Sequence, residues 1–303
     1  MDTSTPWGAA LNFFVGDIIK IFVLLVVIIF AVSLLRTFFP PEKVRDRLAK
    51  LPRFVAHILA ALLGIITPFC SCSAVPLFLG FVEAGIPLGV TFSFLVASPM
   101  INEVALVMLL GLFGWQIALL YIGLGLVIAI VAGLVLGKLK VEPLLQDFVL
   151  KNIGKAPPMA TIRQTWGDRA SFAWGYTLDI LRKVSLWVVL GVGLGAWIHG
   201  YVPQDLLAQW AGRSNPLAVP IAVLIGIPLY SNAAGVLPLV AALTEKGVAM
   251  GTALAFMMAV TALSFPEFMI LRKVMRVKLV AIFASVVGIG IILVGYVFNA
   301  LLR

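Results

Sequence analysis

Two cysteines, Cys70 and Cys72, lie one residue apart in the segment 68–76, which interrupts an apolar stretch. Thiols bind soft metals and metalloids, and Ser71 and Ser73 add hydroxyl groups beside them. Residues at positions i and i+2 point to different faces of a helix, but they can converge on one ligand where the backbone is unwound. The chemistry expected here is binding of a small thiophilic substrate, or of a soft metal ion, by Cys70 and Cys72. The alternative is that both are small buried side chains without a ligand.

Two prolines bracket the cysteine pair and predict a broken helix. Proline lacks a backbone donor and disfavours helical backbone at the preceding residue, so Pro68 and Pro76 predict half-helix ends at Thr67 and Val75. In lipid, unpaired backbone groups cost several kcal/mol each, so such breaks occur only where protein or a water-lined cavity surrounds them. Broken helices near the middle of the membrane are the usual substrate sites of secondary transporters.

A second interruption follows at Pro99, with Asn102 and Glu103 between apolar runs. Carboxylates inside a membrane are costly and usually functional, so Glu103 is a candidate proton carrier. Glu267 is the corresponding candidate later in the chain, displaced by a few residues. The alternative is that Glu103 lies nearer the membrane surface or is stabilised by helix ends.

Composition identifies the class of protein that must position these residues. The chain has 303 residues, 62% of them hydrophobic and only 12% charged, with a mean hydropathy of +1.12. These values exclude a soluble globular domain and predict an all-α polytopic membrane protein. Several apolar runs are shorter than the roughly 20 residues of a full span, which predicts broken or re-entrant helices among roughly 8–10 membrane segments. The net charge of +9 lies in loops and indicates orientation in the bilayer rather than nucleic-acid binding.

The chain also repeats itself at a spacing of 162 residues. Without a gap, this spacing superimposes Gly64 on Gly226, Pro76 on Pro238, Glu83 on Glu245, Gly85 on Gly247 and Gly89 on Gly251. The repeat places a second break near residues 228–235, where Tyr230, Ser231 and Asn232 are candidate substrate contacts. The gapless register sets Asn232 opposite Cys70, whereas a shift of two residues would pair Tyr230 with Cys70.

Loop charges indicate that the two repeats are inverted. Segment 36–53 carries six basic residues, while its counterpart, segment 198–215, carries only Arg213. The turn at 111–114 is uncharged, while its counterpart contains Arg272, Lys273, Arg276 and Lys278. Since basic loops remain in the cytoplasm, the bias predicts inverted-topology repeats at 14–137 and 176–299, a cytoplasmic linker at 138–175, and both termini outside the cytoplasm.

The cysteine motif, together with the downstream Ser98-Pro99-Met100-Ile101-Asn102 segment, resembles the predicted permease family that includes the ArsP-type organoarsenical efflux permeases. The resemblance covers nearly the whole chain. It implies a permease of the bacterial inner membrane and, in some members, export of trivalent organoarsenicals. Carried onto this chain, it implies that Cys70 and Cys72 bind a soft ligand, with Pro99 and Asn102 beside them.

The function expected from these features is secondary transport, without catalysis and without a cofactor. The expected partners are the lipid bilayer and a small-molecule or metalloid substrate, with no nucleic acid. The nearest alternative is a membrane thiol-disulfide oxidoreductase that cycles Cys70 and Cys72, although the sequence has no second cysteine pair to relay electrons. An uncoupled channel is the third possibility.

Overall fold

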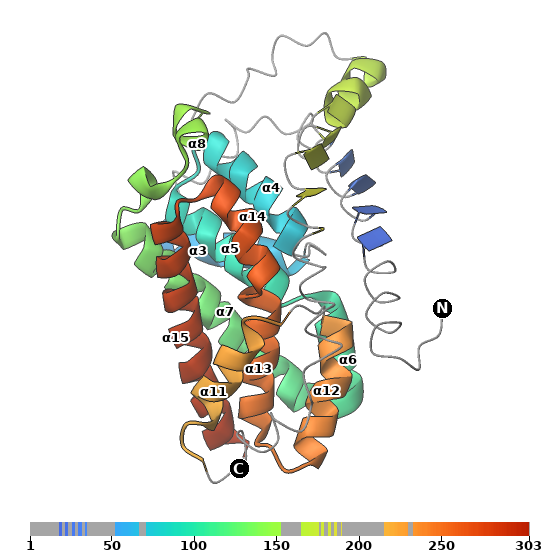
Figure 1. Ribbon diagram of the computed structural model, residues 1–303, viewed down its shortest axis with the longest axis vertical. Coiled ribbons are helices and arrows are strands. Elements are labelled where there is room, and N and C mark those ends of the chain that lie inside the picture. The colour runs from blue at the N-terminus through green and yellow to red at the C-terminus, as the bar shows by residue number, and fades with distance from the viewer. Residues whose placement is uncertain are drawn as a thin grey trace.

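The computed structural model describes residues 52–66, 71–152, 165–175, 215–229 and 233–302, with isolated positions between 18 and 34 and between 177 and 189. The named elements within this part of the chain are all helices, as the sequence predicts, and an isolated β-bridge joins Leu145 to Met275 (Figure 1). The first half contains α3 (Arg53–Ile66), α4 (Ser71–Glu83), α5 (Leu88–Met100), α6 (Glu103–Phe113) and α7 (Trp115–Lys138). After η1 (Glu142–Leu144) and α8 (Asp147–Asn152), the second half contains α11 (Ala218–Gly226), α12 (Ala233–Glu245), α13 (Met250–Ala262), α14 (Phe265–Val274) and α15 (Val277–Leu301).

Helix lengths separate complete spans from half-spans. α7 has 24 residues and α15 has 25, enough to cross a hydrocarbon core of about 30 Å. α5 and α13 have 13 residues each and are too short to cross alone. Each continues into its successor through a bend, of 49° between α5 and α6 and 44° between α13 and α14. The chain is therefore a helical, multi-pass membrane protein that contains broken spans.

The spacing of 162 residues recurs in the helix boundaries and in the packing. α4 and α12 begin and end at equivalent residues, as do α5 and α13, and the turns after α4 and α12 both use a glycine with positive φ, Gly85 at 79° and Gly247 at 89°. Glycine takes this backbone conformation without the steric penalty of other residues. Gly64 packs closely against the backbone oxygen of Phe94, and its counterpart Gly226 packs against that of Phe256.

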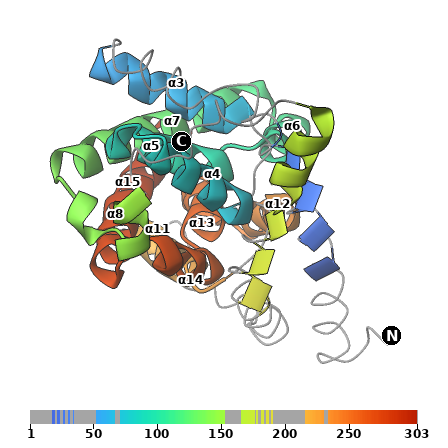
Figure 2. The same ribbon diagram turned by 90° about the horizontal axis from the view of Figure 1, so that it is seen from above.

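α5 and α13 form the centre of the bundle. Every residue of α5 is buried, as is every residue of α13 after Met250. A helix that is apolar on all sides requires contact all around it, and here α3, α4 and α7 surround α5, while α11, α12 and α15 surround α13 (Figure 2). By contrast, α7 and α15 expose large apolar side chains at equivalent positions, such as Val127 with Ile289 and Val131 with Leu293. Such side chains suit contact with lipid tails.

α7 and α15 run antiparallel. The segment directly after α7 pairs with the start of α15, because the Arg276 N–H donates to the Leu144 carbonyl over 2.8 Å and the Gln146 N–H donates to the Val274 carbonyl over 2.9 Å. The same two helices meet again near their midpoints, where Gly290 lies against Ile128. The end of one helix therefore lies beside the start of the other.

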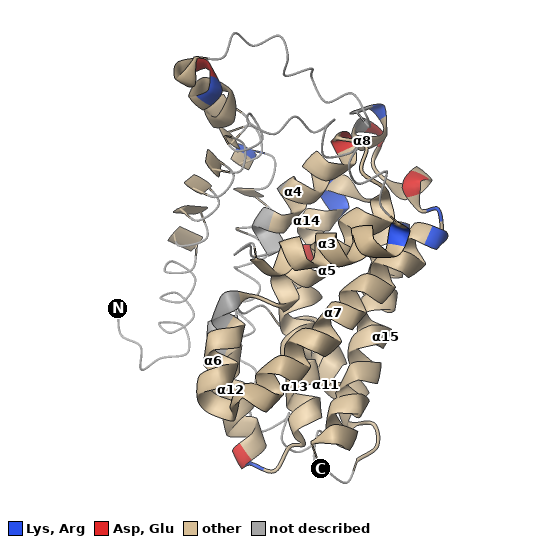
Figure 3. Ribbon diagram, turned by 180° about the vertical axis from the view of Figure 1, so that it is seen from behind, with Lys and Arg blue, Asp and Glu red and all other residues tan. Residues whose placement is uncertain are grey.

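Charged residues distinguish the two ends of the bundle. We call the end where α7 finishes and α15 begins the basic end, and the opposite end the neutral end. Figure 3 shows Lys and Arg gathered toward the basic end, beside α8. Among described residues, the neutral end has the adjacent pair Glu245 and Lys246, at the turn between α12 and α13. The charged residues at the basic end include Lys138, Lys140, Asp147, Arg272, Lys273, Arg276 and Lys278.

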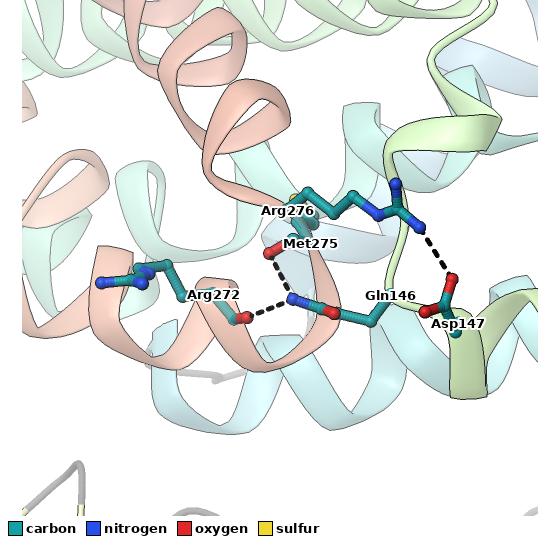
Figure 4. Close-up of polar contacts among 5 residues, drawn as sticks. All are labelled: Gln146, Asp147, Arg272, Met275 and Arg276. Carbon is teal, nitrogen blue, oxygen red and sulfur yellow. Dashed lines mark hydrogen bonds and ion pairs between the residues drawn. The ribbon is translucent and has the colours of Figure 1, made fainter.

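The first part of the connection between the halves is docked on the basic end (Figure 4). The Gln146 side chain donates through Nε2 to the carbonyl oxygens of Arg272 and Met275, over 3.1 and 3.3 Å. Arg276 forms an ion pair with Asp147 at 2.7 Å, although both side chains are exposed. Residues 145–147 thus hold the turn between α14 and α15 in place.

Candidate functional site

Four short helices begin near the middle of the bundle. α6 starts after the break that ends α5, and α14 starts after the break that ends α13. α4 runs to a turn that leads into α5 at the basic end, and α12 runs to a turn that leads into α13 at the neutral end. Figure 1 shows α4 beside α14 in one half of the molecule and α6 beside α12 in the other. Helix N-termini carry partial positive charge and unpaired N–H groups, so this region favours electron-rich ligand atoms.

The break between α5 and α6 lies beside the middle of α7. A Cβ added to Gly125 would lie 2.8 Å from Cδ1 of Ile101, so glycine permits this close approach. The Tyr121 hydroxyl, which is buried, donates to the Met100 carbonyl over 2.7 Å and satisfies an acceptor at the end of α5. Pro99 is buried in the last turn of α5, so the helix continues one residue past the proline and breaks at Ile101 and Asn102.

Asn102 has a structural role at this break. It is the N-cap of α6, and its Oδ1 accepts a hydrogen bond of 2.7 Å from the backbone N–H of Ala105. Asparagine is among the best N-cap residues because its side chain satisfies one N–H that the first helical turn leaves unpaired. Glu103 is the first residue of α6, where the helix dipole favours a carboxylate. The structure describes the backbone of Glu103 and not its side chain.

The break between α13 and α14 has the same form with different residues. Ser264 is the N-cap of α14 without a side-chain capping bond, and the Phe265 N–H donates to the Ile227 carbonyl over 3.0 Å. This bond places the start of α14 against the end of α11. Glu267 lies in the first turn of α14 and is only 1% exposed. The two candidate proton carriers therefore occupy the first turns of α6 and α14.

The predicted helix end at Val75 is wrong. α4 begins at Ser71 and continues through Pro76 to Glu83, so Ser71, Cys72 and Ser73 form its first turn and are not unwound. The structure describes the backbone of these three residues. Pro76 lies in the second turn of α4 and lacks the N–H that would donate to the carbonyl of residue 72. The remaining backbone hydrogen bonds and the packing of α4 on α5 maintain the helix. Pro238 lies inside α12 at the equivalent position.

The other members of the predicted site lie outside the described residues. These are Thr67, Pro68 and Cys70 at the first break, and Tyr230, Ser231 and Asn232 at the second. The described segments that flank them are α3 and α4, and residues 215–229 and α12. Among the described residues no group of three or more His, Cys, Asp or Glu could hold a metal ion. Binding through Cys70 and Cys72 stays a prediction.

A polar pair that the sequence did not indicate lies between α3 and α5. His57 is buried, and its Nδ1 lies 2.8 Å from Oγ of Ser93, which is also buried. The pair lies against Gly133 of α7. In the second half Val219 and Ala255 occupy the equivalent positions and lie against Gly295. The two halves therefore share a backbone arrangement while one has a polar contact where the other is apolar.

Two cavities lie toward the neutral end. The first is a groove of about 680 Å³ between α6 and α12, lined in part by Met108, Gly111, Ala241 and Glu245. The second, of about 530 Å³, lies at the ends of α11, α13 and α15, where Tyr296 donates to the Pro216 carbonyl over 2.6 Å and Asn299 donates to Thr252 over 3.2 Å. Of these two cavities, the groove is the one that lies along two of the helices that begin mid-bundle.

The chain matches one protein family over nearly its whole length. The model of the ArsP_1 family, described as predicted permease, matches residues 6–300. A UPF0718 protein of Methanocaldococcus jannaschii is 24% identical over 306 residues, covering 83% of this chain and 84% of the relative. The UPF0718 protein YraQ of Escherichia coli is 25% identical over 295 residues, covering 96% and 81%.

A shorter similarity links the chain to a Streptococcus mutans protein whose name describes a subunit of a two-component membrane permease complex. The two are 24% identical over 169 residues, covering 55% of this chain and 54% of the relative. No solved structure matches the chain.

Proposed function

The chain belongs to the ArsP_1 family of predicted permeases, which supports a membrane transporter, and from this premise we propose that it is a secondary transporter with a substrate site near the middle of the membrane. The observation that supports this proposal is the arrangement of four half-helices, α4, α6, α12 and α14, which begin mid-bundle next to the two breaks. Secondary transporters bind substrates and coupling ions where discontinuous helices meet. The sequence contains no phosphate-binding loop with its lysine, which argues against an ATP-driven pump in this chain.

The proposed substrate is a small thiophilic compound, such as a trivalent organoarsenical or a soft metal ion, and the proposed direction is export. Cys70 and Cys72 would bind it through sulfur, with Ser71, Ser73, Asn102 and the Tyr230–Asn232 segment around it. The position of Cys72 in the first turn of α4 supports this assignment, since a helix N-terminus stabilises thiolate, the form of cysteine that binds soft ions.

Proton coupling is proposed through Glu103 and Glu267. Glu103 lies in the first turn of α6 and Glu267 in the first turn of α14, just after the breaks. The burial of Glu267 in an apolar bundle is typical of an intramembrane carboxylate with a function. Glutamine at either position would retain size and hydrogen bonding while removing the proton that can be exchanged. Glu103→Gln is therefore expected to reduce transport driven by a pH gradient in inverted vesicles, whereas the same change at exposed Glu142 in the linker is expected to leave it intact. Identical wild-type rates with and without the gradient would contradict the coupling.

The two halves are proposed to be inverted-topology repeats in a bacterial inner membrane, with the basic end in the cytoplasm and both termini outside it. Two observations support inversion: the equivalent helices α7 and α15 run antiparallel, and basic residues gather at one end of the bundle. The arrangement would assign residues 14–137 and 176–299 to the membrane and 138–175 to the cytoplasm.

The test of the proposed function is flux into proteoliposomes that contain purified protein. Wild type is expected to transport a trivalent phenylarsenical, and the variant with Cys70→Ser and Cys72→Ser is expected to transport it no faster than protein-free liposomes. Ser285→Ala, on the exposed face of α15, is the matched control and should retain full flux. Unchanged flux in the double serine variant would contradict the soft-ligand site.

The same samples distinguish the enzymatic alternative. Mass spectrometry of alkylated protein during turnover should find Cys70 and Cys72 permanently reduced. A disulfide that forms and disappears with turnover would instead identify a thiol-disulfide oxidoreductase.

A further inference from the structure

The helix pairs α6–α12 and α4–α14 are equivalent in the repeat. A shift of 162 residues carries α6 onto α14 and α4 onto α12, so the contact between α6 and α12 has its counterpart in the contact between α4 and α14. Figure 1 shows the two pairs on opposite sides of the middle of the bundle. The first pair extends to the neutral end and the second to the basic end.

The two pairs differ in how exposed their equivalent side chains are. Leu112 of α6 is 52% exposed, while its counterpart in α14, Val274, is 5% exposed. Met108 is half-buried and lines the groove, while its counterpart Ile270 is 1% exposed. We therefore call α4–α14 the closed pair. The α6–α12 pair leaves the groove of about 680 Å³ and is the open pair.

Charge follows the same division. In the α6–α12 groove, Gly111 and Glu245 both line the cavity, so its wall has a carboxylate on α12 and a position without a side chain on α6. The equivalent positions in the closed pair are Lys273 and Glu83, and both of these residues are engaged in interactions. The closed pair therefore has an ammonium group at the position where the wall of the groove has Gly111.

We infer that the two helix pairs are the two gates of the transport path, with α4–α14 closed at the basic end and α6–α12 open at the neutral end. This inference rests on the proposed transport function. The groove lies along the middle and final turns of α6 and α12, between the mid-bundle starts of these helices and the neutral end. Met108 lines its inner part with a thioether, a soft ligand that suits a thiophilic substrate, and Glu245 lies at its outer end. The lysine at position 273 and the glycine at position 111 determine which gate is closed.

Thiol labelling tests the gates without any substrate. In an otherwise unchanged chain, Met108→Cys should react with a membrane-impermeant maleimide from the neutral side. Ile270→Cys in the same background should be protected from either side. Peptide mass spectrometry separates these sites from Cys70 and Cys72. Equal reactivity of the two introduced cysteines would overturn the assignment of open and closed gates.

The second arm changes the gate. Gly111→Lys should slow labelling of Met108→Cys by about fivefold, because an ion pair with Glu245 favours the closed groove. Gly111→Gln, which has a similar size and no charge, should slow it less, and Glu245→Gln added to Gly111→Lys should restore most of the rate. Equal slowing by lysine and glutamine would show that size alone blocks the groove and would overturn the role of charge. Absence of phenylarsenical flux in the wild type, with the labelling pattern intact, would instead count against the proposed substrate.

Discussion

Gly290 of α15 packs against Ile128 of α7, the residue that stands 162 positions earlier, and a Cβ added to the glycine would lie 3.2 Å from Cγ2 of the isoleucine. Two antiparallel helices that meet at equivalent residues are related by a local two-fold axis through the contact. In the proposed transport cycle, the closed and open helix pairs are alternative forms of one interface, and rocking about this axis would interchange them.

Gly290→Leu should therefore destabilise the protein. The larger side chain overpacks the crossing of α7 and α15, at an expected cost of about 1–3 kcal/mol in the free energy of unfolding. Gly123→Leu on the exposed face of α7, where nothing lies within 4 Å of an added Cβ, is the matched control and should be tolerated. Ile128→Ala combined with Gly290→Leu should recover part of the loss. Equilibrium unfolding in detergent measures all three, and equal stability of both leucine variants would contradict the crossing.

The His57–Ser93 pair should behave as a coupled unit. Ser93→Ala alone leaves the buried His57 Nδ1 without its partner and should cost about 1–3 kcal/mol. His57→Val with Ser93→Ala recreates the apolar pair found at Val219 and Ala255, so the double variant should lose less stability than the sum of the single variants. A double-mutant cycle on unfolding free energies gives the coupling, and strictly additive losses would exclude the contact.

Asn102 can be tested for capping and substrate binding separately. Asn102→Ala removes the side-chain acceptor for the Ala105 N–H and should destabilise the protein by about 0.5–2 kcal/mol, whereas Asn102→Ser retains an N-cap acceptor and should not. If Asn102 also binds substrate, the serine variant will be stable yet show an increased KM for transport. Wild-type KM in the serine variant would limit Asn102 to its structural role.

The docked linker should depend more on Gln146 than on the ion pair beside it. Arg276 and Asp147 are exposed, so Asp147→Asn should change the unfolding free energy by about 0–1 kcal/mol, with an effect that salt removes. Gln146→Ala loses hydrogen bonds to two backbone carbonyl groups and should make the linker easier to cleave by protease at its junction with α7. Similar cleavage rates for wild type and Gln146→Ala would show that the backbone bonds alone hold the linker.

The sequence predicts those features that depend on local chemistry. Glycine and proline coincidences at the 162-residue spacing locate the repeat, and the turns at Gly85 and Gly247 indeed share a positive φ. The break near Pro99 is also where the pattern places it, although the helix continues to Met100. The same reasoning is wrong at Pro76, because helix packing outweighs the local penalty of one proline.

Features that depend on tertiary proximity could not be predicted. His57 and Ser93 lie on different helices and meet because Gly89 and Gly133 allow α3, α5 and α7 to approach closely. The groove beside Gly111 likewise exists only because α6 and α12 lie side by side, and no periodicity within either helix indicates this.

Thiol accessibility at two equivalent residues tests the inverted arrangement most directly. Trp115 begins α7 and Val277 begins α15, and both are exposed, at 64% and 59%. In intact cells, an impermeant maleimide should label Trp115→Cys, whereas Val277→Cys should be labelled only after the membrane is permeabilised. Labelling of both from the same side would contradict inverted repeats and the transport path built on them.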